Sequence, residues 1–567
     1  WRVRTGAYEG DEPYRAALQA AGFEMIRRFW RMRIDFDGLA SRIVAAPGVS
    51  EKPYALLKAG APGTVYLLET TIGATPGSGG TLQRYKVADR KFTAFASEVV
   101  DYAVSADGKR LVYRTAAPGA GGPPAPGAKP APPALFLVDA DKAAPAAGTG
   151  KLTYTLRMML DPVAEFAQIF AEGWRNQRDY LYQPNMQGSD WPRMREHYGR
   201  LLPWVRHRAD LNYLLDMMGA EIAIGHSYVR GGDMPDLPAS TGGLLGADLT
   251  VESGRYRFAR LYDNESWNPD LKAPLAVPGV RVQRGDWLLA VNGEELRSTD
   301  NVHRLLEGTA GKQTVLTVND RPTFEGARTI TVVPVANEQT LRTRAWVEDN
   351  RRTVDRLSGG KLAYVYVPNT GQPGYTSFNR YYFSQQDKPG VIVDERYNGG
   401  GSAADYMIEV MQRTFDGYFN NVAGDRVPFT SPAAGIWGPK VMLINEMSGS
   451  GGDYLPYMFR ARRIGTLVGK RTWGGLVHTA DTPTFVDGGS MIAPRGGYFA
   501  AGGEGRWAVE NEGVAPDVDV ENWPKDVVAG HDAQLERAVR IALDELAAKP
   551  VERLMKEPAP PTWGKRK

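Results

Sequence analysis

A serine stands in a turn of small residues between an apolar run and an amphipathic run. The apolar run Val441–Ile444 is typical of a buried strand, and Asp453–Arg460 has the spacing of a helix. The turn between them is Ser448-Gly449-Ser450-Gly451-Gly452. A sharp strand-to-helix turn exposes a side chain at the sheet edge and aims the free N–H groups of the helix start at the same place. Ser450 is therefore a candidate nucleophile and the Gly451 N–H a candidate oxyanion donor, although a Gly/Ser loop with a serine N-cap has the same composition.

A general base is the second group that such chemistry needs, and His226 is the best-placed histidine. It lies between a glycine and a serine where a helical run ends, in the sequence AIGHSYVRGGD. The chain has five other histidines, in polar or turn contexts: His197 and His207 among arginines, His303 and His531 at polar helix starts, and His478 after a glycine turn. Because a lone histidine is more often structural than catalytic, this candidate depends on the fold around it.

Two further groups complete the chemistry of acyl transfer. Glu510 is the candidate carboxylate for orienting the base, since it lies between an apolar run and a glycine turn. On its own, that position is more typical of a solvated acid at a strand end. Gly400 ends the run GVIVDERYNGGG and is the candidate for a second oxyanion donor. Ser448 is a competing nucleophile that lies further from the predicted helix start.

The glycine turns are expected at one edge of a sheet. Strand and helix patterns alternate over residues 345–548, which predicts an α/β layer with a partly parallel sheet. Ligands of such sheets collect beyond the carboxyl ends of the strands, where turns 398–401 and 448–452 are predicted to lie.

His226 belongs to a different region, in which the hydrophobic period is helical. Three helical runs are predicted, at residues 162–182, 191–205 and 210–222, with Asp210 as a plausible N-cap of the last. More than 200 residues separate His226 from Ser450, so only folding can bring the two together.

Residues 240–336 have the order of a PDZ-like β domain. A glycine loop at 242–246 leads into strands, and the run GDWLLAVNG at 285–293 is fairly specific for this fold. Such domains bind a peptide by adding it as a strand, and their glycine loop can hold a terminal carboxylate. The predicted carboxylate loop contains Leu244, Leu245 and Gly246.

Residues 1 to about 150 have short strands at near-regular spacing. The clearest unit, Tyr102–Arg114, has Asp107-Gly108 at the tip of a hairpin, and Ile34–Val44 has a similar pattern. These units predict β-propeller blades, with room for only two or three. Together with the start at Trp1 without a methionine, this predicts a missing N-terminal part. The Pro/Ala/Gly segment Ala116–Ala134 is predicted to be a flexible loop.

Composition limits the classes of function. Of 567 residues, 43% are apolar, which is ample for several cores, and the net charge of +3 gives no reason to invoke nucleic acid or an acidic membrane surface. No apolar run is long enough for a membrane span. The absence of cysteine excludes disulfides, thiolate metal sites and cysteine nucleophiles.

The order of these regions, with four motifs, resembles the tricorn protease family within the tail-specific serine peptidases. The motifs are GHSY, DERYNGGG, NEMSGSGGD and VENEGVAPD. The resemblance implies these roles: nucleophile Ser450, base His226, orienting carboxylate Glu510, and oxyanion donors Gly451 and Gly400, with Gly399 as the nearest competitor of Gly400.

Two positions depart from the family pattern. The family has a serine immediately before the histidine, bridging it to the glutamate, and here that place is Gly225. Either Glu510 reaches the imidazole directly or through water, or Ser227 takes a modified part. The residue after the nucleophile is Gly451 where the family predicts aspartate, and a backbone donor survives this change.

The predicted architecture is multidomain. It comprises C-terminal blades of a β-propeller (1–158), a helical core subdomain with His226 (159–239), a PDZ-like domain (240–340), an α/β core subdomain with Ser450 (341–550) and a polar tail (551–567). The predicted function is a serine endopeptidase of tricorn type that degrades short peptides without metal or cofactor. The alternative is a catalytically inactive protein that binds peptides through its PDZ-like and propeller surfaces, which the change at Gly225 favours. The resemblance further implies a homo-oligomer, a hexamer in the family, and a cytoplasmic location, with a periplasmic one left open.

Overall fold

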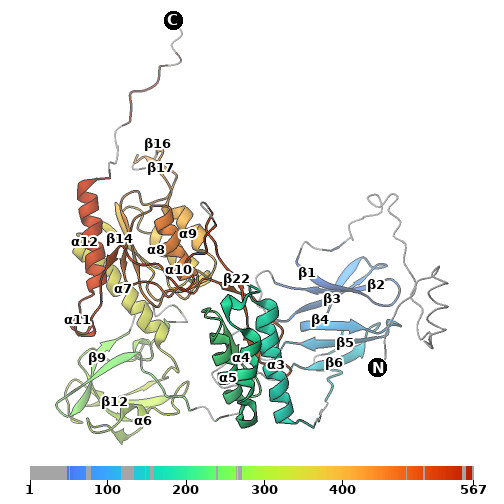
Figure 1. Cartoon of the computed structure of the whole chain (residues 1–567). Coiled ribbons are helices and arrows are strands. Elements are labelled where there is room, and N and C mark those ends of the chain that lie inside the picture. The colour runs from blue at the N-terminus through green and yellow to red at the C-terminus, as the bar shows by residue number, and fades with distance from the viewer. Residues whose placement is uncertain are drawn as a thin grey trace, which may run out of the picture. The chain divides into compact units, whose positions relative to one another are not determined.

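The computed structural model (Figure 1) describes residues 48–564 apart from 50–51, 72–77, 117–132, 147, 154–156, 158, 236, 238–239, 263–264, 266–267, 269–270, 425, 481, 502–504, 552–556 and 563. The chain divides into two compact units, Trp1–Arg157 and Met158–Lys567. Within the described residues, no helix is long and apolar enough to cross a membrane.

The first unit contains one antiparallel sheet in which neighbouring strands follow one another along the chain. Its strands are β1 (Tyr54–Ala59), β2 (Thr64–Glu69), β3 (Gly80–Lys86), β4 (Lys91–Val104), β5 (Arg110–Thr115) and β6 (Leu135–Asp139). The predicted hairpin at Asp107-Gly108 joins β4 to β5, with Gly108 at φ +71°. The strands lie in one six-stranded sheet, so their assignment to propeller blades stays a prediction. The predicted strand Ile34–Val44 and most of the segment Ala116–Ala134 lie outside the described residues.

The helical region contains α3 (Pro162–Tyr180), α4 (Trp191–Gly199) and α5 (Arg208–Ala220), which confirms the three predicted helices. The N-cap of α5 is His207 and not Asp210, because the His207 Nδ1 accepts the Ala209 N–H at 3.0 Å. A later part of the chain completes this region: β7 (Tyr228–Arg230) pairs with β21 (Ser490–Ile492), and Phe485 and Met491 join the helical core.

The PDZ-like region is an antiparallel sheet in the order β13-β12-β10-β9-β8, with β11 on β10. Its elements are β8 (Ala247–Glu252), β9 (Arg255–Leu261), β10 (Trp287–Val291), β11 (Glu294–Glu295), α6 (Val302–Leu305), β12 (Thr314–Asn319) and β13 (Arg328–Val332). Asn292 and Gly293 both have positive φ, as the tight turn between β10 and β11 requires.

The α/β region holds a five-stranded parallel sheet in the order β14-β15-β18-β19-β23. The strands are β14 (Leu362–Tyr366), β15 (Gly390–Asp394), β18 (Lys440–Ile444), β19 (Thr466–Gly469) and β23 (Val518–Asp519), and the helices are α7 (Gln339–Ser358), α8 (Gln372–Phe383), α9 (Ala404–Met411), α10 (Gly451–Ala461), α11 (Pro524–Val528) and α12 (Ala533–Ala548). Short strands outside this sheet are β16 (Gly417–Phe419), β17 (Phe429–Ser431), β20 (His478–Thr479) and β22 (Pro494–Gly496).

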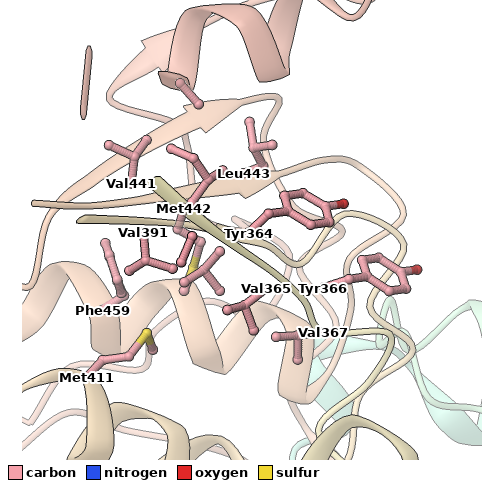
Figure 2. Packing of buried hydrophobic residues seen from close by; sticks show 14 of the residues in the cluster. Tyr364, Val365, Tyr366, Val367, Val391, Met411, Val441, Met442, Leu443 and Phe459 are labelled. Atoms are coloured by element: carbon pink, nitrogen blue, oxygen red, sulfur yellow. The ribbon is translucent and has the colours of Figure 1, made fainter. Parts of the chain in front are cut away.

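Helices cover both faces of this sheet. Because successive strands are added in one direction and such crossovers are right-handed, α8, α9 and α10 cover one face, while α7 and α12 pack together on the other. Strands β14, β15 and β18 are buried along their whole length, which explains their unbroken apolar runs. Figure 2 shows part of this core, where Met411 of α9 and Phe459 of α10 belong to the same cluster as Val391 of β15. The sheet thereby fixes the carboxyl ends of β15 and β18, from which the two glycine turns arise.

Candidate active site

Ser450 occupies the N-cap of α10, directly after the turn that ends β18. Its backbone has φ 58° and ψ −115°, a conformation that a non-glycine residue adopts only when its surroundings impose it. The Ser450 N–H donates to Asp453 Oδ2 at 2.8 Å, which fixes the turn at the helix start. The competing nucleophile Ser448 is fully buried, and its hydroxyl donates to the Glu395 carbonyl at 2.9 Å. Ser450, by contrast, is partly exposed.

The buried Asp453 carboxylate holds the serine turn against a second loop. Besides the Ser450 N–H, it accepts the Thr472 hydroxyl at 2.5 Å and the N–H groups of Gly474 and Gly475 at 2.8 and 3.0 Å. Burial raises the pKa of Asp453, and these hydrogen bonds oppose that rise. Asp453 was not among the site residues predicted from the sequence. Its place three positions after a serine, at a predicted helix start, is the pattern that could have indicated it.

The turns after β15 and β18 are in direct contact. The Gly449 N–H donates to the Asn398 carbonyl at 3.0 Å. A Cβ on Gly400 would lie 3.1 Å from the Ser450 Oγ, so the Gly400 backbone passes beside the candidate nucleophile. The turns predicted at one sheet edge therefore lie together there.

The candidate oxyanion donors differ in their present hydrogen bonds. No acceptor for the Gly451 N–H is found among the described residues. The Gly400 N–H donates to the Asn398 Oδ1 at 2.9 Å, and the Gly399 N–H to the Pro368 carbonyl at 3.0 Å. A Cβ on Gly451 would lie 1.9 Å from the Thr370 Oγ1, which explains why glycine stands at this position.

His226 lies in the loop between α5 and β7 and is 8% exposed. The other five histidines, all elsewhere in the described chain, are exposed. Burial lowers the pKa of His226, the Glu510 carboxylate opposes this change, and His478 adds to it. The Nδ1 atom is buried and has no hydrogen-bond partner among the described residues.

The Glu510 carboxylate holds the loop that carries His226 by accepting a hydrogen bond from the backbone of that loop. Its Oε1 accepts the Gly225 N–H at 3.1 Å, and its Oε2 accepts the N–H groups of Leu476 and Val477, each at 2.6 Å. Within the described chain, no hydrogen bond joins Glu510 to the imidazole or the imidazole to Ser450. Ser227 is bound elsewhere, since its Oγ accepts the Gln177 Nε2 at 3.0 Å, which ties the loop to α3.

The loops of the candidate base and nucleophile meet at one side chain, Trp473. Its ring centroid lies 5.3 Å from that of His226. A Cβ on Gly225 would lie 2.9 Å from this indole, and a Cβ on Gly449 would lie 2.6 Å from it. Folding therefore brings residues 225–226 and 449–450 to the same place, although the sequence interpretation did not single out Trp473.

The predicted carboxylate loop of the PDZ-like region is hydrogen-bonded internally. The Leu244 N–H donates to the Val335 carbonyl at 2.8 Å, and the Gly246 N–H to the Glu338 Oε2 at 2.9 Å. No acceptor for the Leu245 N–H is found in the described part of the chain. Carboxylate binding by this loop stays a prediction.

Three family models match successive parts of the chain. They are the Tricorn protease C1 domain over residues 162–220, the Tricorn protease PDZ domain over 243–337 and Peptidase family S41 over 361–520. The chain belongs to the tricorn protease family.

Tricorn protease homolog 1 of Streptomyces coelicolor is 34% identical over 535 residues, which cover 91% of this chain and 48% of that protein. A putative Tricorn-like protease C-terminal subunit of Sulfurisphaera tokodaii is 29% identical over 531 residues, covering 91% of this chain and 58% of that protein. A crystal structure of the tricorn protease superposes with a TM-score of 0.74 at 25% identity, over 87% of this chain and 46% of that one. The chain thus spans about half the length of the curated relatives it matches. The family resemblance predicted from the motifs is confirmed, as is the combination of helical, PDZ-like and α/β regions.

Proposed function

We propose that this chain is a serine endopeptidase of tricorn type that cleaves peptides through an acyl-enzyme. The observation that carries the proposal is the meeting of two loops: a strained serine turn with an open N–H at a helix start, and the loop of the one buried histidine in the described chain. The membership of residues 361–520 in Peptidase family S41 supports the same reaction.

In the proposed reaction, the Ser450 Oγ attacks the carbonyl carbon of the scissile peptide bond and its proton passes to His226. The tetrahedral intermediate then collapses, the C–N bond breaks, and His226 returns the proton to the leaving amine. A water molecule, deprotonated by His226, hydrolyses the ester and regenerates the Ser450 hydroxyl. Because burial lowers the pKa of His226, the imidazole is neutral near pH 7, as a base must be.

The developing oxyanion is assigned to the N–H groups of Gly451 and Gly400. Gly451 has its N–H open in the structure, whereas Gly400 has to exchange its bond with the Asn398 Oδ1 for one with the oxyanion. Hydrogen bonds of free enzymes commonly become productive only when substrate is bound. Glu510 acts on the base through the Gly225 N–H, and a water molecule is the proposed link to the imidazole.

Short peptides are the proposed substrates, and a homo-oligomer is the proposed assembly, a hexamer if this chain follows the family. A cytoplasmic location is proposed on the same basis. The rival function is binding of peptides without hydrolysis. It is favoured by the bonding of Glu510 to the backbone and not to the imidazole.

Active-site labelling separates the two functions. A fluorophosphonate probe should label Ser450, as mapped by mass spectrometry, and Ser450→Ala should abolish labelling and lower kcat/KM by several orders of magnitude. Ser402→Ala, at an exposed serine beside the neighbouring turn, is the matched control and should keep both the labelling of Ser450 and the native kcat/KM. Peptide hydrolysis at the normal rate by Ser450→Ala would refute the assignment, and peptide binding without labelling would establish the rival.

A further inference from the structure

We infer that Trp473 is the positioning residue of His226: its indole is wedged between the loops of the base and the nucleophile and fixes the imidazole by packing. The inference deepens the proposed function and rests on it for its kinetic consequences. The packing itself can be tested without activity.

Three glycines make room for the indole. A Cβ on Gly225 would lie 2.9 Å from its Cη2 and Cζ2, one on Gly449 2.6 Å from its Cε3, and one on Gly475 2.3 Å from its Cζ3. None of these glycines has the positive φ that would itself call for glycine. Their common requirement is therefore the space that Trp473 occupies. The indole spans from the residue before Ser450 to the residue before His226.

The backbone of Trp473 is fixed relative to the nucleophile. Its N–H donates to the Ser448 carbonyl at 2.9 Å. Its neighbours Thr472 and Gly474 donate to the Asp453 carboxylate, which also accepts the Ser450 N–H. Because its backbone is held this way, the indole has a fixed position relative to the serine turn. The imidazole that packs against the indole is thereby positioned relative to the same turn.

The imidazole packs against the Trp473 indole. The two ring centroids are 5.3 Å apart with an interplanar angle of 57°, and Tyr228 packs on the imidazole at 5.8 Å. The Nδ1 atom has no partner among the described residues, so the direct contacts that the protein makes with this ring are packing contacts. The indole also occupies the space that a side chain at position 225 would need. Glycine at 225 is therefore required by the tryptophan at 473, which fills the space next to it.

A double-mutant cycle tests the wedge. Trp473→Ala should lower kcat/KM about 10- to 100-fold, mainly through kcat, since a base displaced by about 1 Å is inefficient. Trp473→Phe should lower kcat/KM by less than Trp473→Ala does. Gly225→Ala should cost about tenfold in the native chain, where the added methyl meets the indole, and under about twofold in Trp473→Ala, where the space is free. Trp523→Ala, at a tryptophan of similar exposure, should leave kcat/KM unchanged.

A second readout does not need catalysis. With ¹³C,¹⁵N-histidine labelling and His226→Asn for assignment, the His226 ring resonances should move in Trp473→Ala as the ring current of the indole is lost. The pKa of His226 should rise toward its ordinary value as water reaches the ring, with Glu510 and His478 as the other groups that act on it.

These results separate the two hypotheses. If the native protein neither cleaves peptides nor labels at Ser450, the proposed function fails, but the His226 resonances still decide the packing. Unchanged His226 resonances and pKa in Trp473→Ala, in a protein that unfolds at the native temperature, would overturn the inference. Multiplicative effects of the Gly225 and Trp473 substitutions would overturn it as well.

Discussion

Two glycine-rich turns of this chain were predicted to present N–H groups to an anion. The hydrogen bonds of these N–H groups differ between the two turns in the structure. In the turn at 448–452, the Gly451 N–H has no acceptor among the described residues, and Ser450 is held in a strained conformation beside it. In the turn at 242–246, the N–H groups of Gly243 and Gly246 donate to the Leu306 carbonyl and to the buried Glu338 carboxylate. We call the first the open turn, because its free N–H lies beside the strained serine. We call the second the closed turn, because in residues 243–246 only the Leu245 N–H has no acceptor among the described residues.

The two turns differ in which of their N–H groups an acceptor reaches. In the serine turn, Asp453 accepts the Ser450 N–H from three residues ahead, and the Asn398 carbonyl accepts the Gly449 N–H, but neither takes the N–H of Gly451. The N–H groups of the PDZ-like turn meet acceptors at Leu306, Val335 and Glu338, and the Glu338 carboxylate in turn accepts the Arg342 Nε–H at 2.7 Å. Glycine content predicts that a turn can approach an anion, whereas the distant acceptors decide whether its N–H groups are free.

The largest effect is expected from removing the proposed base. His226→Ala should lower kcat/KM for peptides by about a thousandfold or more, because Ser450 then has no group to take its proton. Steady-state hydrolysis of a fluorogenic peptide measures this effect. His303→Ala, at an exposed histidine of the PDZ-like region, is the control and should retain the native rate. Equal losses in both variants would remove the functional distinction between the two turns.

A methyl group added to the open turn should have the next largest effect. In Gly451→Ala the Cβ would lie 1.9 Å from the Thr370 Oγ1 and 2.4 Å from the Gly401 carbonyl oxygen. Relieving this contact displaces the start of α10, so kcat should fall about a hundredfold, and the free energy of unfolding by about 1–3 kcal/mol. Kinetics and urea unfolding measure the two losses. Native kcat in a stably folded Gly451→Ala protein would show that the placement of this N–H is unimportant.

The two turns also show what the sequence could and could not predict. Ser450 and Gly451 were selected as candidates because a strand, a turn and a helix are local patterns, and His226 because its surroundings are unusual for a histidine. Trp473, Thr370 and Glu338 were missed because their roles depend on contacts between segments far apart in the chain. Similarly, β21 completes the helical region from more than 250 residues away, and no local pattern indicates its partner.

A pH profile tests whether the open turn works through His226. Because burial lowers the pKa of His226 below its ordinary value of 6.5, the midpoint of the acidic limb of kcat/KM should lie below pH 6.5, with a fall of about tenfold per unit below the pKa. The unfolded chain takes up this proton at higher pH than the folded chain, so stability also declines as pH falls from 6.5 through the folded pKa. Circular dichroism at each pH separates the two effects. An acidic limb with its midpoint at or above pH 6.5 in a folded protein would contradict the lowering of the His226 pKa by burial.

Opening the closed turn should give a smaller effect. In a Ser450→Ala background that prevents hydrolysis, Glu338→Ala frees the Gly246 N–H and removes a buried negative charge beside it. Binding of a peptide with a free C-terminal carboxylate, followed by fluorescence anisotropy, should tighten by about tenfold or more, since hydrogen bonds to charged groups contribute about 1.5–3 kcal/mol. The same peptide with an amidated C-terminus should gain nothing, and Glu325→Ala is the matched exposed control. Tight carboxylate-dependent binding by the native loop, unaffected by Glu338→Ala, would show that the turn is already open.

The smallest effects are expected from methyl groups added to the closed turn, where neighbouring glycines form an internal control. A Cβ on Gly242 meets no atom within 4 Å, so Gly242→Ala should change the free energy of unfolding by no more than about 0.5 kcal/mol. A Cβ on Gly243 would lie 2.0 Å from the Thr309 Oγ1, so Gly243→Ala should cost about 1–3 kcal/mol. Neither should alter kcat/KM, because this turn is internally bonded and lies in the PDZ-like region. Gly451→Ala and Gly243→Ala thus introduce similar clashes with a threonine hydroxyl, and only the first should affect catalysis. If Gly243→Ala lowered kcat/KM as much as Gly451→Ala, the loss would reflect stability alone and the functional contrast between the two turns would fail.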